Sequence, residues 1–206
     1  MTITDNLNND ISNAPTWFKE SISIKPSEQS INDKDGKISY SKWVSKNDST
    51  NLLILIHGTG AHKKWWDPIA PQFLNETNVI AVDLPGMGDS DFRNNYSIKD
   101  FGKCIFSIID KEKIEMNIEN IYIVGHSLGG QVAAYVASEN KNLVTSLIMI
   151  DTFIRPPDYD PSQHEGGPLR KIKHYPDKIT ILERFRLMPE QTCHNTWFLR
   201  YIAEYS

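Results

Sequence analysis

The chain has 206 residues, of which 39% are hydrophobic, and a formal net charge of −4 at pH 7. This length corresponds to about one domain, or to one domain with an appendage, and is enough to bury a core without a disulfide or metal. The acidic balance argues against nucleic acid as a partner, because binding phosphates requires a basic surface. No apolar run approaches the ~20 residues of a membrane span. The two cysteines, Cys104 and Cys193, fit neither a disulfide framework nor a metal cluster, so we expect two free thiols.

The first 44 residues of the sequence predict a leader followed by a hairpin. Residues 1–16 are rich in Asn, Asp, Ser and Thr, and we expect them to form a flexible leader. They contain no apolar segment of the kind found in secretory signals, which favours a cytoplasmic protein. Residues 21–25 and 37–44 alternate between apolar and polar side chains as strands do, and residues 27–36 between them contain turn formers.

The middle of the chain alternates between short apolar runs and segments with helical spacing. The apolar runs are short and rich in β-branched residues, as in strands that are buried on both faces of a parallel sheet. They are residues 52–56, 79–82, 121–124 and 147–150. The segments with helical spacing are residues 65–74, 98–113 and 128–139. This order predicts a doubly wound, mostly parallel α/β sheet, in which a site forms at the carboxyl ends of the strands.

The strongest motif is Gly125-His126-Ser127-Leu128-Gly129, which follows an apolar strand and opens a helix. In that setting a G-x-S-x-G sequence is typical of a nucleophile elbow, with Ser127 on a strained turn. Gly125 and Gly129 are required because side chains there would clash where the strand and the helix approach. The first turn of the helix presents N–H groups toward an oxyanion. An ordinary glycine-rich turn is the alternative interpretation.

A second motif, His57-Gly58-Thr59-Gly60, ends the apolar strand of residues 52–56. We expect the backbone amide of Thr59 to pair with that of Leu128 and form an oxyanion hole. His57 is better explained by hydrogen bonds to the loop backbone than by catalysis.

A third motif, DLPGMGDS at residues 83–90, follows the strand of residues 79–82. Its two glycines and its proline predict a loop at the same edge of the sheet. Asp83, Asp89 and the neighbouring Asp91 could form a carboxylate or metal site, but capping of local turns explains them more simply.

Together the three motifs, in this order, resemble the α/β-hydrolase superfamily in its lipase, esterase and acyl-hydrolase branch. The resemblance covers residues 17–151. Members with aspartate at the elbow open epoxides or displace halide, so Ser127 implies attack on a carbonyl carbon. The expected function is a serine hydrolase that acts on an ester, thioester or similar acyl substrate through a Ser127 acyl-enzyme. An acyltransferase and a non-catalytic binding protein with the same fold are the alternatives.

The resemblance also implies that part of the catalytic machinery is missing. The superfamily orders its triad as serine, acid and histidine, with the histidine after the last strand. Residues 17–151 would then form the core with its first six strands, and residues 152–206 the start of a helical cap with a helix at 177–188. We therefore expect a C-terminally truncated form without the last two strands and without an identified histidine. Asp151 is a candidate triad acid or, equally, the cap of a turn.

The spacing of the remaining polar and aromatic residues singles out no further catalytic residue. His126 is expected to point away from the site. Other candidate bases, each equally explained as surface residues, are His62, His164, His174 and His194. Candidates for an apolar pocket wall or for core are Trp65, Trp66, Phe153 and Met188, and Arg184 and Arg186 could bind a carboxylate or face solvent. No cofactor, metal or nucleotide is implied, and the oligomeric state stays open.

Overall fold

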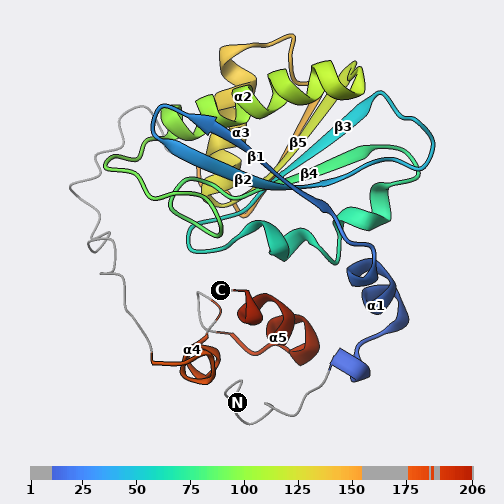
Figure 1. Cartoon of the computed structure of the whole chain (residues 1–206), viewed down its shortest axis with the longest axis vertical. Coiled ribbons are helices and arrows are strands. Elements are labelled where there is room, and N and C mark those ends of the chain that lie inside the picture. The colour runs from blue at the N-terminus through green and yellow to red at the C-terminus, as the bar shows by residue number, and fades with distance from the viewer. Residues whose placement is uncertain (1–10, 155–175, 186, 188–190, 206) are drawn as a thin grey trace. The chain divides into compact units, whose positions relative to one another are not determined.

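The computed structural model describes residues 11–154, 176–185, 187 and 191–205 (Figure 1). Residues 14–152 with Tyr205 form one compact unit, called the core unit below. The other described residues, 11–13 and those between 153 and 204, form a second, smaller unit. The assignment of a leader, a core and a cap to these parts of the chain stays a prediction.

The core unit is built on a six-stranded sheet with the order β1-β2-β4-β3-β5-β6. The strands are β1 (Ser27–Asp33), β2 (Gly36–Trp43), β3 (Asn51–Ile56), β4 (Asn78–Val82), β5 (Asn120–His126) and β6 (Ser146–Ile150). The last four run parallel to one another, and the β1–β2 hairpin joins β4 in antiparallel pairing. The predicted α/β class, with a mostly parallel sheet and an N-terminal hairpin, is therefore confirmed.

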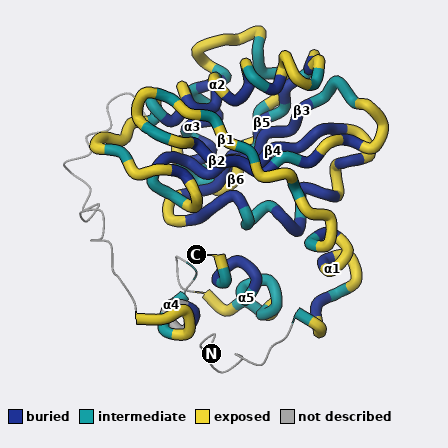
Figure 2. The backbone as a smooth tube through the Cα atoms, viewed as in Figure 1, coloured by how far each residue is buried: buried dark blue, intermediate teal, exposed yellow. Residues whose placement is uncertain are grey.

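Each face of the sheet buries its own apolar cluster, because side chains alternate along every strand. Helices α2 (Ile98–Met116) and α3 (Leu128–Glu139) cover one face and pack against Ile54 and its neighbours. Leu55 and its neighbours on the opposite face pack beneath the 3₁₀ helix η4 (Ala70–Phe73). The two central strands, β3 and β4, are accordingly buried along nearly their whole length (Figure 2).

The prediction of a strand at residues 21–25 is wrong. Helix α1 (Thr16–Ser23) occupies this segment and buries Phe18 and Ser21, which lie three residues apart on one helical face. The hairpin strand is β1 instead, within the stretch that we expected to form a turn. A two-residue turn suffices because Gly36 adopts a φ of +130° and the Asp33 carboxylate accepts the N–H of Asp35 at 2.8 Å.

Two of the predicted helices also differ from the structure. Residues 65–74 form no α-helix but parts of two 3₁₀ helices, η3 (Lys63–Trp66) and η4, because Pro68 and Pro71 interrupt the hydrogen-bond ladder. Helix α4 (Lys178–Arg184) begins where we expected, after the N-cap Asp177, but ends at Arg184 rather than at residue 188. A further helix, α5 (Thr196–Glu204), was not predicted. Near the N-terminus, η2 (Ile11–Asn13) packs against α5 within the smaller unit.

A buried ionic cluster connects β2 to α2. Glu112 of α2 is fully buried, and its carboxylate accepts a hydrogen bond from the Tyr40 hydroxyl at 2.5 Å. Its other oxygen lies 2.6 Å from the ammonium group of Lys42. The Lys111 ammonium donates to the Tyr40 hydroxyl oxygen at 2.8 Å. The antiparallel hairpin is thus held on the same helix that covers the parallel strands.

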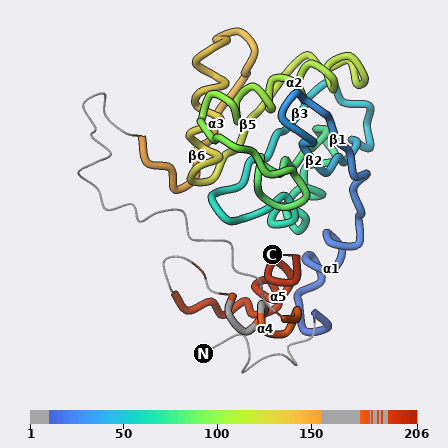
Figure 3. The backbone as a smooth tube through the Cα atoms, turned by 60° about the vertical axis from the view of Figure 1, so that its left-hand side comes forward, coloured from blue at the N-terminus to red at the C-terminus, as the bar shows by residue number. Residues whose placement is uncertain are grey.

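Strand β6 is an edge of the sheet although its sequence, SLIMI, is apolar (Figure 3). It pairs with β5 on one side, and no strand among the described residues pairs with its other side. Ile148 is 56% exposed and Ile150 is 43% exposed. Both belong to the face of the sheet that carries Leu55, since paired residues of parallel strands share a face.

Candidate active site

Ser127 lies between the end of β5 and the first turn of α3. Its backbone has φ +51° and ψ −117°, a conformation that a residue with a side chain adopts only under strain. The strain is held in place by backbone hydrogen bonds on both sides. The N–H of Ser127 donates to Ile150 at 2.9 Å, and the carbonyl of Ser127 accepts the N–H of Gly130 at 3.0 Å. The geometry is the strained strand-to-helix turn expected at this position.

The glycines of the motif allow backbones to approach where no side chain would fit. A Cβ atom on Gly125 would lie 2.3 Å from the carbonyl oxygen of Gly129. A Cβ atom on Gly129 would lie 2.4 Å from the carbonyl oxygen of Ile56, at the end of β3. Because real Cβ contacts are never this short, both positions require glycine in this arrangement, as the sequence predicts. The elbow is thereby packed directly onto the end of β3.

The turn that follows β3 lies against the elbow. A Cβ atom on Gly58 would be 3.1 Å from the Cβ of Ser127 and 2.8 Å from Nδ1 of the His126 ring. We expected His126 to point away from the site, but its ring lies beside Gly58 of this turn. Thr59 and Gly60 form the exposed tip of the turn, and the carbonyl of Gly58 accepts the N–H of Ala61 at 3.2 Å.

His57 is buried, and both of its ring nitrogens bond to backbone. Its Nδ1 donates to the carbonyl of Gly58 at 2.8 Å, and its Nε2 accepts the N–H of Leu84 at 3.1 Å. Burial lowers the pKa of His57 to about 4, so the ring is neutral near pH 7. This is the backbone role that the sequence predicts, and it joins the turn to the loop after β4.

The two expected oxyanion donors lie at the same edge of the sheet. Leu128 is the first residue of α3, where backbone N–H groups have no acceptor within the helix. Thr59 belongs to the turn that packs against Ser127 through Gly58. Their assignment as donors to an oxyanion stays a prediction.

The end of β6 also contacts the elbow. Thr152 Oγ1 donates to the carbonyl of Ser127 at 3.3 Å, in addition to the bond between Ser127 and Ile150. Asp151 stands between Ile150 and Thr152 in the sequence and has an exposed side chain and a φ of +46°. The candidate triad acid is therefore next to the elbow, and its catalytic role stays a prediction.

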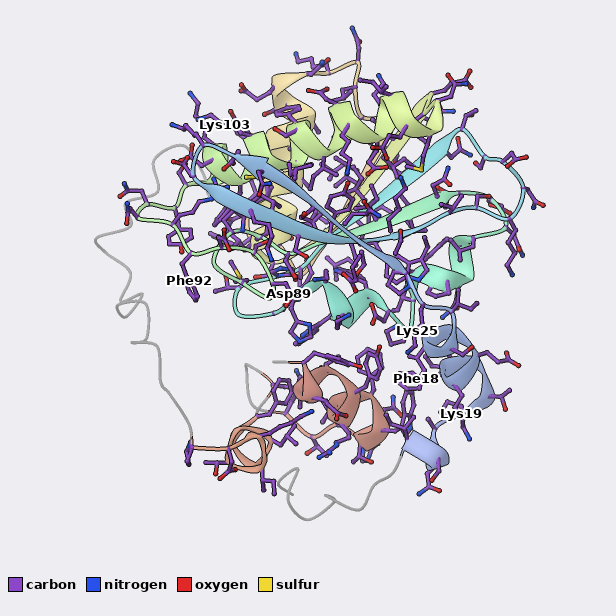
Figure 4. The ribbon with its side chains drawn as sticks, in the orientation of Figure 1. Phe18, Lys19, Lys25, Asp89, Phe92 and Lys103 are labelled. Carbon is purple, nitrogen blue, oxygen red and sulfur yellow. The ribbon has the colours of Figure 1, made fainter. Side chains whose placement is uncertain are left out.

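An ion-pair cluster centred on Lys63 joins the loops near the elbow. The Lys63 side chain is only 1% exposed, and its ammonium donates to Asp83 at 2.8 Å, to Asp89 at 2.6 Å and to the Ser39 hydroxyl at 3.0 Å. Its backbone N–H donates to the other oxygen of Asp83 at 2.6 Å. Figure 4 labels Asp89, which belongs to the loop that follows β4. Asp83 and Asp89 thus pair with a lysine that the sequence reasoning did not single out.

The charges of this cluster stabilise one another. Burial would lower the pKa of Lys63, but hydrogen bonds to Asp83 and Asp89 outweigh it and raise that pKa above its usual value. The hydrogen bond from Lys63 holds the pKa of Asp89 below its usual value. In the sequence, this cluster is indicated only by a lysine that follows the glycine turn and by the two aspartates of the next loop. Asp91 does not cap a local turn with its carboxylate but accepts the N–H of Lys37, in β2, at 2.8 Å.

The other candidate residues belong to different parts of the chain. Trp66 packs against the apolar cluster that contains Leu55, so it belongs to the core. His62 is buried after the glycine turn, whereas His194 and Phe153 belong to the smaller unit and are exposed. Four candidates lie outside the described residues: His164, His174, Arg186 and Met188. The same holds for the side chain of Arg184.

Comparison with known proteins identifies the family. The sequence profile of a family described as the alpha/beta hydrolase fold matches residues 51–180. The chain belongs to this family. The match includes the turn after β3, the loop after β4 and the elbow, which are the three motifs described above.

Named relatives within the alpha/beta hydrolase fold include esterases. A pimeloyl-[acyl-carrier protein] methyl ester esterase of Pseudoalteromonas atlantica is 35% identical over 102 residues, 48% of this chain and 36% of its own. The enzyme of that name from Neisseria meningitidis is 34% identical over 108 residues, 52% of this chain and 39% of its own. The aligned part of the chain thus spans less than two fifths of either esterase.

A solved structure shows the same fold. An alpha/beta hydrolase of Novosphingobium aromaticivorans superposes with a TM-score of 0.54 at 16% identity, over 61% of this chain and 44% of its own. At that identity the likeness concerns the fold only. Among the described residues of this hydrolase-fold chain, no helix is long and apolar enough to cross a bilayer, and no three metal-ligating side chains gather into a site.

Proposed function

We propose that the chain carries the serine nucleophile of an ester hydrolase, and that Ser127 is this nucleophile. The observation that carries the proposal is the strained backbone of Ser127 between β5 and α3, packed against the Gly58 turn. Backbone strain of this size persists only where the surrounding structure maintains it, and such sites are concentrated in active sites. The named relatives, which are methyl ester esterases, favour an ester over the other acyl substrates.

In the proposed reaction, Ser127 Oγ attacks the carbonyl carbon of the ester and forms a tetrahedral intermediate. The negative charge that develops on the carbonyl oxygen is stabilised by the N–H groups of Thr59 and Leu128. The intermediate collapses when the bond to the alkoxy group breaks, and the proton from Ser127 leaves with the alcohol. Water then attacks the acyl-enzyme and releases the carboxylic acid. Asp151, at the end of β6, is the proposed acid that orients a histidine base.

We further propose that His57 is not the general base, and that the chain is a shortened form of the enzyme. Support comes from His57, whose two ring nitrogens are both occupied by backbone groups. Further support comes from β6, whose apolar residues are exposed although its composition suits the interior of a sheet. The aligned part of the chain covers less than two fifths of these esterases, which leaves room in them for additional strands.

A single-turnover experiment tests the nucleophile without requiring a base that is efficient over many cycles. The chain is incubated with p-nitrophenyl acetate, and the acetylated residue is located by peptide mass spectrometry. We expect acetylation at Ser127 and its loss in Ser127→Ala. Ser138→Ala, which removes an exposed hydroxyl of the same helix, is the matched control and should leave acetylation unchanged. Absence of any Ser127 acetylation would favour a non-catalytic protein of this fold.

Steady-state turnover of the same ester tests the missing base. A serine hydroxyl is a weak nucleophile unless a base takes its proton. We therefore expect turnover by the 206-residue chain to stay near the rate of Ser127→Ala. Robust turnover that depends on Ser127 would show that a histidine of this chain serves as the base.

A further inference from the structure

The glycine turn beside Ser127 is held at both ends by the loop that follows β4. At its start, the ring of His57 bonds the carbonyl of Gly58 and the N–H of Leu84. At its end, Lys63 bonds Asp83 through both its backbone N–H and its ammonium group. The residues between these two attachments include Thr59, the proposed oxyanion donor.

The loop that receives these bonds is itself fixed to the sheet. The Ser90 hydroxyl donates to the carbonyl of Asp83 at 2.7 Å and accepts the N–H of Ser39, in β2, at 2.8 Å. The N–H of Asp89 donates to the Asp83 carboxylate at 2.9 Å. A Cβ atom on Gly88 would lie 2.3 Å from that carboxylate, so the loop closes tightly around it. Asp83 is therefore a rigid anchor for whatever binds it.

From these contacts we infer that Lys63 is a positioning residue, whose ion pairs with Asp83 and Asp89 hold the Thr59 amide in place beside Ser127. The inference rests on the proposed function, because an oxyanion donor matters only if Ser127 attacks a carbonyl. A buried ion pair adds little net stability compared with apolar residues of the same volume. The pair at Lys63 instead fixes geometry, and a displacement of about 1 Å at a reacting centre can cost about 100-fold in rate.

The neighbouring lysine provides a matched control. Lys64 belongs to the same 3₁₀ helix, but its side chain is 24% exposed and its ammonium pairs with Glu28 at 3.0 Å. Replacing Lys64 by methionine removes the same charge from the same element without touching Asp83. Glu28 also lies 3.5 Å from the Lys63 ammonium, so both substitutions remove a partner of Glu28, whereas only the one at Lys63 removes the bond to Asp83.

The test compares Lys63→Met, the double variant Lys63→Met with Asp83→Asn, and Lys64→Met. Lys63→Met leaves the Asp83 charge buried without its main partner and can unfold the chain. The double variant removes both charges and keeps an oxygen that can accept the N–H of residue 63, although the N–H of Asp89 loses its acceptor. It is therefore expected to fold with a lower stability than wild type. Circular dichroism and thermal unfolding identify the variants that are folded.

The first measurement is amide hydrogen exchange at Ala61 and at position 63, which reports on the turn whether or not Ser127 reacts. We expect exchange at least about 10-fold faster in the double variant and unchanged in Lys64→Met. The second measurement is the rate constant for acetylation of Ser127. It should fall about 10- to 100-fold at saturating ester, with the half-saturating concentration within about threefold.

Exchange at the wild-type rate in a folded double variant would overturn the inference. An accelerated exchange with an unchanged acetylation rate constant would overturn it as well, because the turn would then move without consequence for Ser127. If the wild-type chain is not acetylated at all, the proposed function fails. In that case the exchange measurement still decides whether Lys63 holds the turn.

Discussion

The two edge strands of the sheet have opposite chemistry. β1 reads SEQSIND and exposes mainly polar and charged side chains, including Glu28, which pairs with Lys64. β6 reads SLIMI and exposes Ile148 and Ile150. Natural edge strands carry charges and polar groups that discourage pairing with further chains, and β1 follows this rule whereas β6 does not. β1 is therefore built as an edge of the sheet, and β6 has the composition of an interior strand.

The end of β6 is closely packed, whereas one face of the same strand is exposed. There its last residues bond to the elbow, and glycines allow backbone atoms from β3, β5 and α3 to touch. The site is thus closely packed beside a strand that has little cover. The difference indicates that the six strands of the sheet are enough to position the elbow and its turn.

The largest effect on stability is expected for Gly129→Ala, in the closely packed region where β3, β5 and α3 meet. Alanine normally favours a helix over glycine, but here its Cβ would collide with the carbonyl of Ile56. We expect the free energy of unfolding to fall by about 3 kcal/mol or more. Gly60→Ala is the control, because its Cβ would meet nothing within 4 Å and only its φ of +71° is unfavourable, which costs about 1 kcal/mol. Urea unfolding of both variants measures the difference, and equal losses would contradict the close packing.

The next test concerns the pH dependence that His57 gives to the packed region. Its pKa is about 4 in the folded chain against an ordinary value of 6.5, so between these values only the unfolded chain binds the proton. The free energy of unfolding should therefore fall as the pH is lowered across this interval, by on the order of 3 kcal/mol. Asp89, whose pKa lies below its usual 3.8, adds to the loss only in more acidic solution.

His57→Gln isolates this contribution because glutamine does not titrate. Although the variant is less stable at neutral pH, its stability should change much less across the same pH interval. Urea unfolding at several pH values, with wild type in parallel, provides the measurement. An unchanged slope would mean that other groups cause the acid sensitivity.

The smallest expected effect is at the uncovered strand. Ile148→Thr should change the free energy of unfolding by less than about 0.5 kcal/mol, because the side chain is already 56% exposed. Ile54→Thr, at a fully buried position of β3, is the matched control and should cost about 2–4 kcal/mol. Light scattering at rising protein concentration should show less self-association for Ile148→Thr than for wild type. A large loss of stability in Ile148→Thr would mean that β6 is covered in solution.

The parallel strands and the elbow could be predicted from the sequence because each depends on local patterns. Apolar β-branched runs mark β3, β4 and β5, and glycine spacing marks the close approach at Gly129. The first hairpin strand was misplaced because polar sequences such as SISIK and SEQSIND alternate equally well. Only tertiary packing, through the burial of Phe18, decides that the first segment is helical.

The Lys63 cluster could not have been predicted in the same way. It joins residues from β2, η3 and the loop after β4, which are far apart in the chain and meet only because β4 pairs with both β2 and β3. Lysine is almost never fully buried unless it is paired, so nothing in its local sequence favours an interior position. We expected the aspartates of this loop to cap local turns, and the Asp83 carboxylate does accept the nearby N–H of Asp89. The carboxylates of Asp89 and Asp91, however, bond the distant residues Lys63 and Lys37.

The buried carboxylate of Glu112 has a consequence for how the hairpin assembles. Tyr40 and Lys42 are two residues apart in β2 and face α2 together, so a slip of this strand by one residue would turn both to the opposite face. Glu112 would then be a buried charge without its two partners, which costs about 3–5 kcal/mol. A glutamate 72 positions after Tyr40 therefore selects the correct register of β2, and misaligned hairpins are rejected once α2 docks.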